Sequence, residues 1–139
     1  MLTPFHLAIP VADLELCRIF YRETLGFEEG RSSDHWVDFN FFGHQFVIHL
    51  DKTLKKKDNV ANPVDGKNVP IPHFGVVLKW DDWEKLADRL RKLNVEFIIE
   101  PYIRFKGEAG EQATLFFLDP ERNALEFKAF KNLKQVFSK

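Results

Sequence analysis

The sequence predicts an α+β fold in which two βαβββ modules pair into a curved mixed sheet around an internal cleft. Two segments open alike, because a proline, a histidine and a phenylalanine stand at the start of an alternating strand at residues 4–11 and again at residues 72–80. Each strand runs into an amphipathic helix, and three further strand-like segments follow each helix. Such a duplication leaves each module with one uncovered sheet face, so we expect the two modules to pair.

The first module covers about residues 1–50. Its first strand alternates, with Leu7 and Ile9 on one face and His6 on the other. The helix that follows is capped by Asp13 and ends at Gly26. The three predicted strands lie near residues 27–31, 35–42 and 44–50.

Residues 51–71 interrupt this plan, since they are polar and rich in proline and glycine, and they predict a long connection. The second module, about residues 72–139, begins with a strand over 73–80, and Asp81 with Glu84 resembles a capping box at the start of its helix. The remaining segments are three strands near 95–100, 112–118 and 123–130, and a mobile loop over 101–111. We expect residues 1–139 to form one domain.

Composition narrows the classes of function. The chain has 139 residues, a formal charge of −1 and fifteen phenylalanines, which suits an aromatic core and gives no electrostatic basis for binding nucleic acid or an anionic membrane. No apolar run is long enough to span a bilayer, and no leader precedes the first strand. Cys17 is the single cysteine, lies on the apolar face of its helix, and predicts a packed, inert thiol in a reducing, cytoplasmic protein.

The side chains with the clearest chemical potential follow the duplication. His6 and His73 occupy the same place in the two modules, and His49 and Glu126 occupy the last strand of each module. The matching predicts that His49 corresponds to Glu126. Two histidines and one carboxylate suit a divalent metal and leave coordination positions open, so we expect His6, His73 and Glu126 to line a metal-binding cleft. The alternative is that the two histidines are ordinary core residues.

Other polar residues have weaker claims. His35 stands beside a predicted turn and should be exposed, and His44 falls on the face opposite His49. Arg104 and Lys106 lie in the predicted loop 101–111, where they either hold an anionic substrate group or are simply solvated.

Motifs along nearly the whole chain resemble those of the vicinal oxygen chelate superfamily, which contains glyoxalase I, extradiol ring-cleaving dioxygenases and bleomycin- or fosfomycin-resistance proteins. A narrower similarity, to proteins described as extradiol-dioxygenase-like, lies in residues 36–45 and in His49-Leu50. The motifs that carry the broader resemblance are Pro4-Phe5-His6, Val11-Ala12-Asp13-Leu14, Phe20-Tyr21, Leu25-Gly26-Phe27, Pro72-His73-Phe74-Gly75, Leu118-Asp119-Pro120 and Asn123-Ala124-Leu125-Glu126-Phe127.

The resemblance implies that His6, His73 and Glu126 are the metal ligands. In ring-cleaving dioxygenases the position of His49 commonly holds a histidine that acts as acid and base, whereas glyoxalase I usually has a glutamate ligand there. The ring-cleaving enzymes also carry a tyrosine about ten residues before the metal glutamate, where this chain has Phe116. Tyr102 is the candidate substitute, provided that the predicted loop folds over the cleft.

These residues favour a metal-dependent oxidoreductase of the extradiol dioxygenase type that uses Fe(II) on a small substrate with adjacent, catechol-like oxygens. The first alternative is a glyoxalase-type lyase or isomerase, or a thiol transferase, with Zn, Ni or Mn. The second is a metal-free protein that binds and sequesters a small molecule. In each case we expect a small-molecule ligand, no nucleic-acid or membrane partner, and a homodimer.

Overall fold

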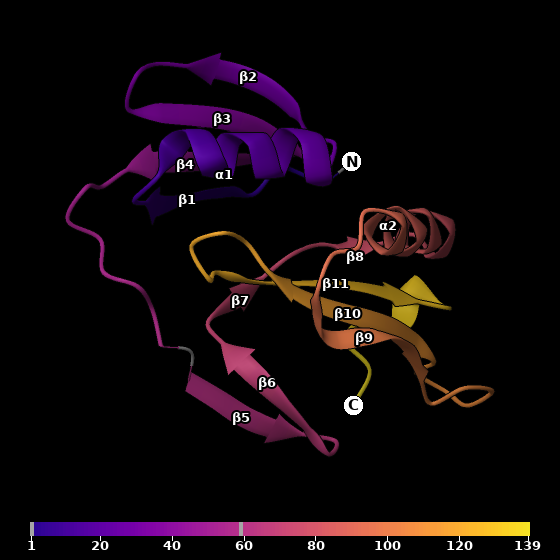
Figure 1. The fold of residues 1–139 in the computed structure, drawn as a ribbon. Helices are drawn as coiled ribbons and strands as arrows, with labels where there is room; N and C mark the ends of the chain where they lie inside the picture. Colours follow the sequence, from indigo (N-terminus) through magenta and orange to yellow (C-terminus); the bar gives the residue numbers. More distant parts are fainter. Residues whose placement is uncertain (1, 59) are drawn as a thin grey trace. The chain divides into compact units, whose positions relative to one another are not determined.

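A computed structural model describes residues 2–58 and 60–139 and divides the chain into two compact units. Unit 1 comprises residues 1–57 with 119–122, and unit 2 comprises residues 58–118 with 123–139. Figure 1 shows strands and helices in both units, which confirms the predicted α+β class. Residue 59, within the predicted connection, lies outside the described residues. None of the described helices is both long and apolar enough to cross a membrane.

Unit 1 is a four-stranded sheet with a helix on one face. The strand order is β1-β4-β3-β2, with β1 parallel to β4 and the other pairs antiparallel. Tyr21, which follows α1, packs its ring on Phe39 and Phe46, so α1 covers the apolar face of the sheet and leaves His6 on the other. Asp13 caps α1 as predicted. The elements are β1 (His6–Val11), α1 (Leu14–Ile19), a π-helical turn (Phe20–Thr24), β2 (Glu28–Ser32), β3 (Trp36–Phe41) and β4 (His44–Leu50).

A short segment from late in the chain completes unit 1. The buried Tyr21 hydroxyl donates to Asp119 Oδ2 at 2.6 Å, and Glu121 Oε1 accepts from the backbone N–H groups of Ala12 and Asp13 at 3.0 and 2.9 Å. Cys17 is fully buried beside these groups. Burial, followed by the negative charge of Asp119, raises the pKa of the Cys17 thiol, which agrees with the predicted inert thiol.

Unit 2 repeats the plan of unit 1. Its strand order is β7-β11-β10-β9, with β8 also pairing β11, and β7 and β8 run parallel to β11. Because β7 with β8 takes the place of β1, the order matches that of unit 1 and confirms the duplication. The elements are β7 (His73–Phe74), β8 (Val77–Leu78), α2 (Trp80–Lys92), β9 (Phe97–Arg104), β10 (Gln112–Leu118), β11 (Ala124–Phe130) and a final 3-10 turn (Leu133–Gln135).

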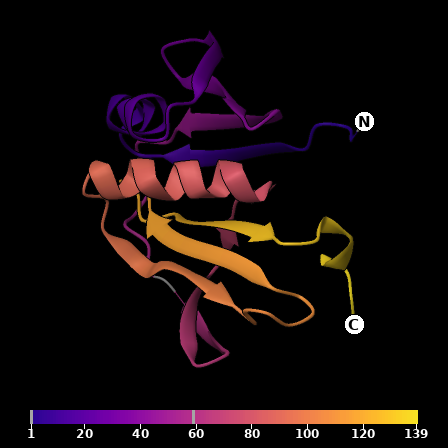
Figure 2. The same cartoon turned by 90° about the vertical axis from the view of Figure 1, so that its right-hand side faces the viewer.

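Helix α2 lies against one face of the unit 2 sheet (Figure 2). The indole Nε1 of Trp83 donates to the Phe127 carbonyl at 2.9 Å, which ties α2 to β11. The predicted capping box is wrong, because Lys79 is the N-cap residue of α2. Asp81 instead lies in the first turn, where its negative charge interacts favourably with the positive end of the helix dipole. The predicted strand over 73–80 is accordingly shorter and is interrupted between β7 and β8.

Two predicted loops contain strands. The connection 51–71 includes an antiparallel hairpin, β5 (Val60–Val64) and β6 (Lys67–Ile71), which turns through Asp65 and Gly66, both with positive φ. The predicted mobile loop 101–111 is also wrong in part, because β9 continues through Arg104. Figure 2 shows the hairpin on the side of the unit 2 sheet away from α2.

Gly75 sits where β7 gives way to β8, opposite Glu126. A Cβ atom at this position would lie 1.5 Å from the Glu126 carbonyl oxygen, which is an impossible contact with backbone. Only glycine lets the chain pass so close to β11. The pairing of His73 with Ala124, and hence the place of His73 beside Glu126, depends on this passage.

We expect Gly75→Ala to lower the free energy of unfolding by more than about 3 kcal/mol, because backbone must move to relieve the clash. Gly30→Ala is the matched control, since its Cβ would meet the Asp38 Cβ at 3.3 Å and the Asp38 carbonyl oxygen at 3.9 Å. Urea denaturation followed by tryptophan fluorescence measures both. Equal losses in the two variants would contradict the close approach at Gly75.

Candidate functional site

His73 and Glu126 lie side by side on the face of the unit 2 sheet that is opposite α2. The alternation of β11 puts Leu125 and Phe127 toward α2 and Glu126 on the other face. The parallel register places His73 beside Ala124, two residues before Glu126. As a result, His73 Nε2 lies 3.1 Å from Glu126 Oε2.

A backbone carbonyl sets the tautomer of His73. His73 Nδ1 lies 2.7 Å from the Pro70 carbonyl oxygen, which can only accept, so Nδ1 carries the proton and donates it. Nε2 is the ring nitrogen that faces the Glu126 carboxylate, whose oxygens are acceptors. Two acceptors at this distance need a cation between them, either a proton on Nε2 or a metal ion.

The pair fits a divalent metal. Two ligands about 2.1 Å from one ion and at a right angle would stand about 3.0 Å apart, close to the observed separation of 3.1 Å. The nitrogen and oxygen donors suit a borderline divalent ion, and the Pro70 carbonyl orients the imidazole as ligand histidines require. Within the described residues no group of three such ligands occurs, and His6 belongs to unit 1.

Neighbours of Glu126 hold its second oxygen. Glu126 Oε1 accepts from the Thr114 hydroxyl at 2.8 Å and lies 3.4 Å from Lys128 Nζ. Thr114 and Lys128 were not among the predicted site residues. The period of two along β10 and β11 would have placed them on the same face as Phe116 and Glu126, which is the signal that could have identified them.

A cavity of about 110 Å³ opens beside this pair and lies wholly within unit 2. The β5–β6 hairpin forms one wall and the sheet forms the other. The ring of Phe116 meets that of His73 edge to face, with centroids 5.1 Å apart. The lining residues are Val64, Lys67, Val69, His73, Ile99, Tyr102, Arg104, Thr114, Phe116, Glu126 and Lys128.

Tyr102 reaches this cavity from a strand, which corrects its predicted place in a loop. It stands opposite Thr114 on β9 and packs against Val69, Ile99 and Phe116. Burial, and then the charge of Glu126, raise the pKa of the Tyr102 phenol. The cavity thus contains a protonated phenol hydroxyl despite the phenylalanine at position 116.

Arg104 is likewise on β9 and forms an ion pair with Asp65 of the hairpin turn. The predicted place of Arg104 in the loop 101–111 is therefore wrong, although it does line the cavity. Lys106 lies beyond the end of β9 and is exposed.

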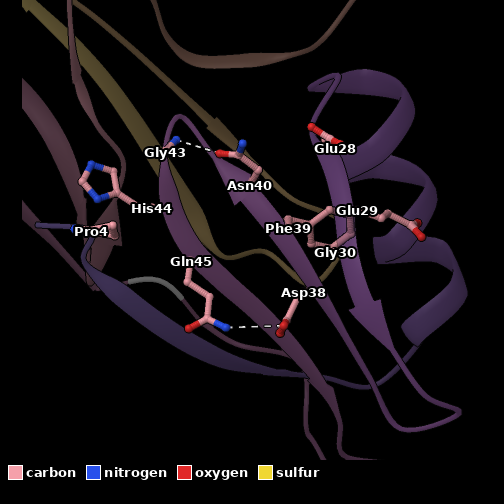
Figure 3. A pocket seen from close by; sticks show the side chains of 10 residues that line it. All are labelled: Pro4, Glu28, Glu29, Gly30, Asp38, Phe39, Asn40, Gly43, His44 and Gln45. Carbon is pink, nitrogen blue, oxygen red and sulfur yellow. Dashed lines mark hydrogen bonds between the residues drawn. The ribbon is translucent and has the colours of Figure 1, made fainter.

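In unit 1, two side chains set the tautomer of His6. Figure 3 shows the Gln45 amide directed at Asp38, with Nε2 3.4 Å from Asp38 Oδ2. Because the carboxylate can only accept, the Gln45 oxygen must face His6, whose Nδ1 lies 2.8 Å away. Nδ1 then carries a proton in His6, as in His73, and Nε2 is the nitrogen left for a ligand.

The register corrects the predicted match between His49 and Glu126. His6 pairs with Gln45, whereas His73 pairs with Ala124, so the residue two positions further along is Val47 in unit 1 and Glu126 in unit 2. His49 instead matches Lys128. It is exposed, on the same face of the sheet as His6, and its acid-base role stays a prediction.

The two remaining histidines of the sequence are His44 and His35. His44 Nδ1 accepts the backbone N–H of Phe5 at 2.9 Å, and His35 is exposed as predicted. His44 also borders an open groove of about 450 Å³ at the sheet of unit 1 (Figure 3). The groove residues are Pro4, Glu28, Glu29, Gly30, Asp38, Phe39, Asn40, Gly43, His44 and Gln45.

Comparison with known proteins identifies a family. A family model described as "Glyoxalase/Bleomycin resistance protein/Dioxygenase superfamily" matches residues 3–127. A solved glyoxalase/bleomycin resistance protein/dioxygenase from Alicyclobacillus acidocaldarius is 29% identical, with a TM-score of 0.78 over 97% of this chain and 96% of that one. Among curated proteins no relative was found.

More distant solved structures share the fold. The fosfomycin resistance protein FosX from Listeria monocytogenes is 19% identical, with a TM-score of 0.67 over 97% of this chain and 98% of that one. A glyoxalase/dioxygenase from Nostoc punctiforme is 16% identical, with a TM-score of 0.69 over 91% and 90% of the two chains.

We expect Gln45→Leu to remove the hydrogen bond that holds the proton of His6 on Nδ1, because leucine has no acceptor. The neutral ring should then be a mixture of the two tautomers. The ¹⁵N chemical shifts of the histidine rings at about pH 8.5, where imidazole is neutral, report the change. His73 should keep its tautomer in the same sample, since Pro70 is untouched. Gln112→Leu in unit 2 is the matched control. An unchanged His6 spectrum in Gln45→Leu would contradict the assigned hydrogen bonds.

Proposed function

The chain belongs to the glyoxalase/bleomycin resistance protein/dioxygenase superfamily, and from this premise we propose that it is a metal-dependent oxidoreductase of the extradiol dioxygenase type. Its substrate would be a small molecule with two adjacent oxygens. The observation that carries the proposal is the 3.1 Å approach of His73 Nε2 to Glu126 Oε2, with the Nδ1 proton engaged by Pro70. The approach leaves a place for one cation.

In this proposal His73 Nε2 and Glu126 Oε2 are two metal ligands, and His6 is the predicted third. A bound divalent ion, with Fe(II) favoured, would act as a Lewis acid and bring the chelating substrate and dioxygen together. Thr114 donates to the other oxygen of Glu126, so the carboxylate keeps Oε2 free for the ion.

The cavity residues would act on the substrate itself. The Tyr102 phenol is protonated over the neutral range, because its pKa is raised, and it can donate a hydrogen bond to a substrate oxygen. Phe116, Ile99 and Val69 are buried apolar neighbours that keep water from this side. His49 remains the predicted acid and base for the substrate proton.

A glyoxalase-type lyase, isomerase or thiol transferase with Zn, Ni or Mn is the second candidate. It is favoured by Phe116, which stands where ring-cleaving enzymes keep a tyrosine. A metal-free binding protein is the third candidate, because a proton on His73 Nε2 would also satisfy the pairing with Glu126. Metal binding separates the third candidate from the first two.

We expect protein purified without chelator to bind one equivalent of divalent metal. His73→Ala, Glu126→Ala and His6→Ala should each weaken metal binding by more than about 100-fold, since ligands matter more than the residues that orient them. Elemental analysis and calorimetry measure the stoichiometry and affinity. His35→Ala is the matched control, because His35 is exposed and outside the proposed site. Full metal binding by His73→Ala would contradict the proposed centre.

We expect the Fe(II)-loaded protein to consume oxygen with a catechol, and Tyr102→Phe to lower kcat by about 100-fold through loss of the phenol proton donor. An oxygen electrode and a panel of catechols measure this. Tyr21→Phe is the control, because Tyr21 is the other tyrosine of the sequence and its hydroxyl donates to Asp119 in unit 1. No oxygen uptake, together with turnover of a glutathione hemithioacetal, would favour the glyoxalase alternative.

A further inference from the structure

The side chains that line the unit 2 cavity carry a net positive charge, which a neutral catechol would leave unbalanced. Three cations line it, Lys67, Arg104 and Lys128, against one carboxylate, Glu126. We infer that the cavity takes a small planar organic anion, an aromatic or other unsaturated carboxylate, whose acid group is bound by Lys67 and Lys128. This inference rests on the proposed function and names its substrate class.

The charges are unevenly satisfied. Arg104 is already paired with Asp65. Lys128 Nζ lies 3.4 Å from Glu126 Oε1, an oxygen that it shares with Thr114, so its pairing is partial. No carboxylate among the described residues forms an ion pair with Lys67. A metal ion on Glu126 would add further positive charge, so an anion is what the loaded cavity requires.

Strand register places the polar side chains of the cavity in rows across the sheet. Lys128, Thr114 and Tyr102 form one row across β11, β10 and β9, and Lys67 Nζ lies 5.4 Å from the centre of the Tyr102 ring. Glu126 belongs to the next row, two residues along β11, or about 6.8 Å away. The side chains bridge the two rows, because Lys128 Nζ lies 3.4 Å from Glu126 Oε1 and Thr114 donates to the same oxygen. The Lys128 ammonium group therefore lies beside the carboxylate that faces His73.

The walls and the size of the cavity suit a flat ring. Val69, Ile99 and Phe116 form an apolar cluster against which Tyr102 packs. Phe116 and Ile99 stand in the same row as Glu126. The cavity measures about 110 Å³. An apolar cavity of roughly 150 Å³ takes up benzene, so this one encloses no more than about a single ring. A flat ring can pack on this cluster with its acid group toward Lys67 and Lys128.

The decisive test compares two probes of equal size, 3,4-dihydroxybenzoate and 3,4-dihydroxybenzamide, on zinc-loaded protein by calorimetry. We expect the carboxylate to bind at least about tenfold more tightly than the amide, because charge-assisted hydrogen bonds are the strong ones. Lys67→Met and Lys128→Met should each remove most of this preference, measured as the ratio of the two affinities in the same variant. Lys85→Met, an exposed position on α2, is the matched control.

The outcomes separate this inference from the proposed function. Protein that binds zinc and treats both probes alike would overturn the inference and leave the metal centre standing. Protein that binds no zinc would overturn the proposed function. Benzoate and benzamide are therefore also compared on metal-free protein, where a preference for benzoate that depends on Lys67 and Lys128 supports the inference and equal affinity overturns it.

Discussion

The close passage of Gly75 past the Glu126 carbonyl is the constraint on which the candidate site depends. Parallel pairing alone would let the strand before α2 run straight along β11, but the chain instead breaks between β7 and β8 at this glycine. The register is the same on both sides of the break, with His73 beside Ala124 and Val77 beside Lys128. An imidazole and a carboxylate from distant parts of the sequence thus meet without either side chain leaving its strand.

The direction of the hydrogen bonds then determines which ligands the pair of His73 and Glu126 can bind. The Pro70 carbonyl can only accept, and so can the carboxylate of Glu126, so His73 donates from Nδ1 and meets the carboxylate through a cation at Nε2, a proton or a metal ion. In unit 1, Asp38 accepts from the amide nitrogen of Gln45, and the amide oxygen of Gln45 therefore faces His6 Nδ1. The proton of His6 is placed on Nδ1 in this way. Two different sets of neighbours therefore give the two histidines the same tautomer, which is the form that a metal ligand needs.

Much of the fold could be predicted because apolar alternation and helix signals agree along most of the chain. The period of two in β11 follows directly from burial on the helix-covered face, whereas β4 and β10 contain runs of consecutive buried residues. The β5–β6 hairpin was missed because Pro63 and Pro70 discourage strand assignment, although Asp65-Gly66 is a strong hairpin signal. Lys79 is the N-cap of α2, and it offers no side-chain signal for the start of the helix.

Tyr102 could not be placed from alternation. Simple alternation would put Ile99 and Tyr102 on opposite faces of β9, yet Ile99 pairs with Phe116 and Tyr102 with Thr114, on one face. The extra residue lies at a bulge that includes Pro101, whose missing N–H suits an interrupted ladder. A bulge of this kind follows from strand pairing in three dimensions and leaves no periodic mark in the sequence.

Strand register also explains why only one of the two predicted matches between the modules is correct. The match of His6 with His73 holds, and the match of His49 with Glu126 does not. His6 and His73 are matched by the strand order, but the register makes Val47 the counterpart of Glu126 and Lys128 that of His49. The two modules have therefore diverged in the strand that pairs with the histidine strand. In module 2, Glu126 lies beside His73, and Lys128 follows two residues later on the same face of β11. The proposed metal ligand and the proposed anion-binding group therefore follow each other along one strand.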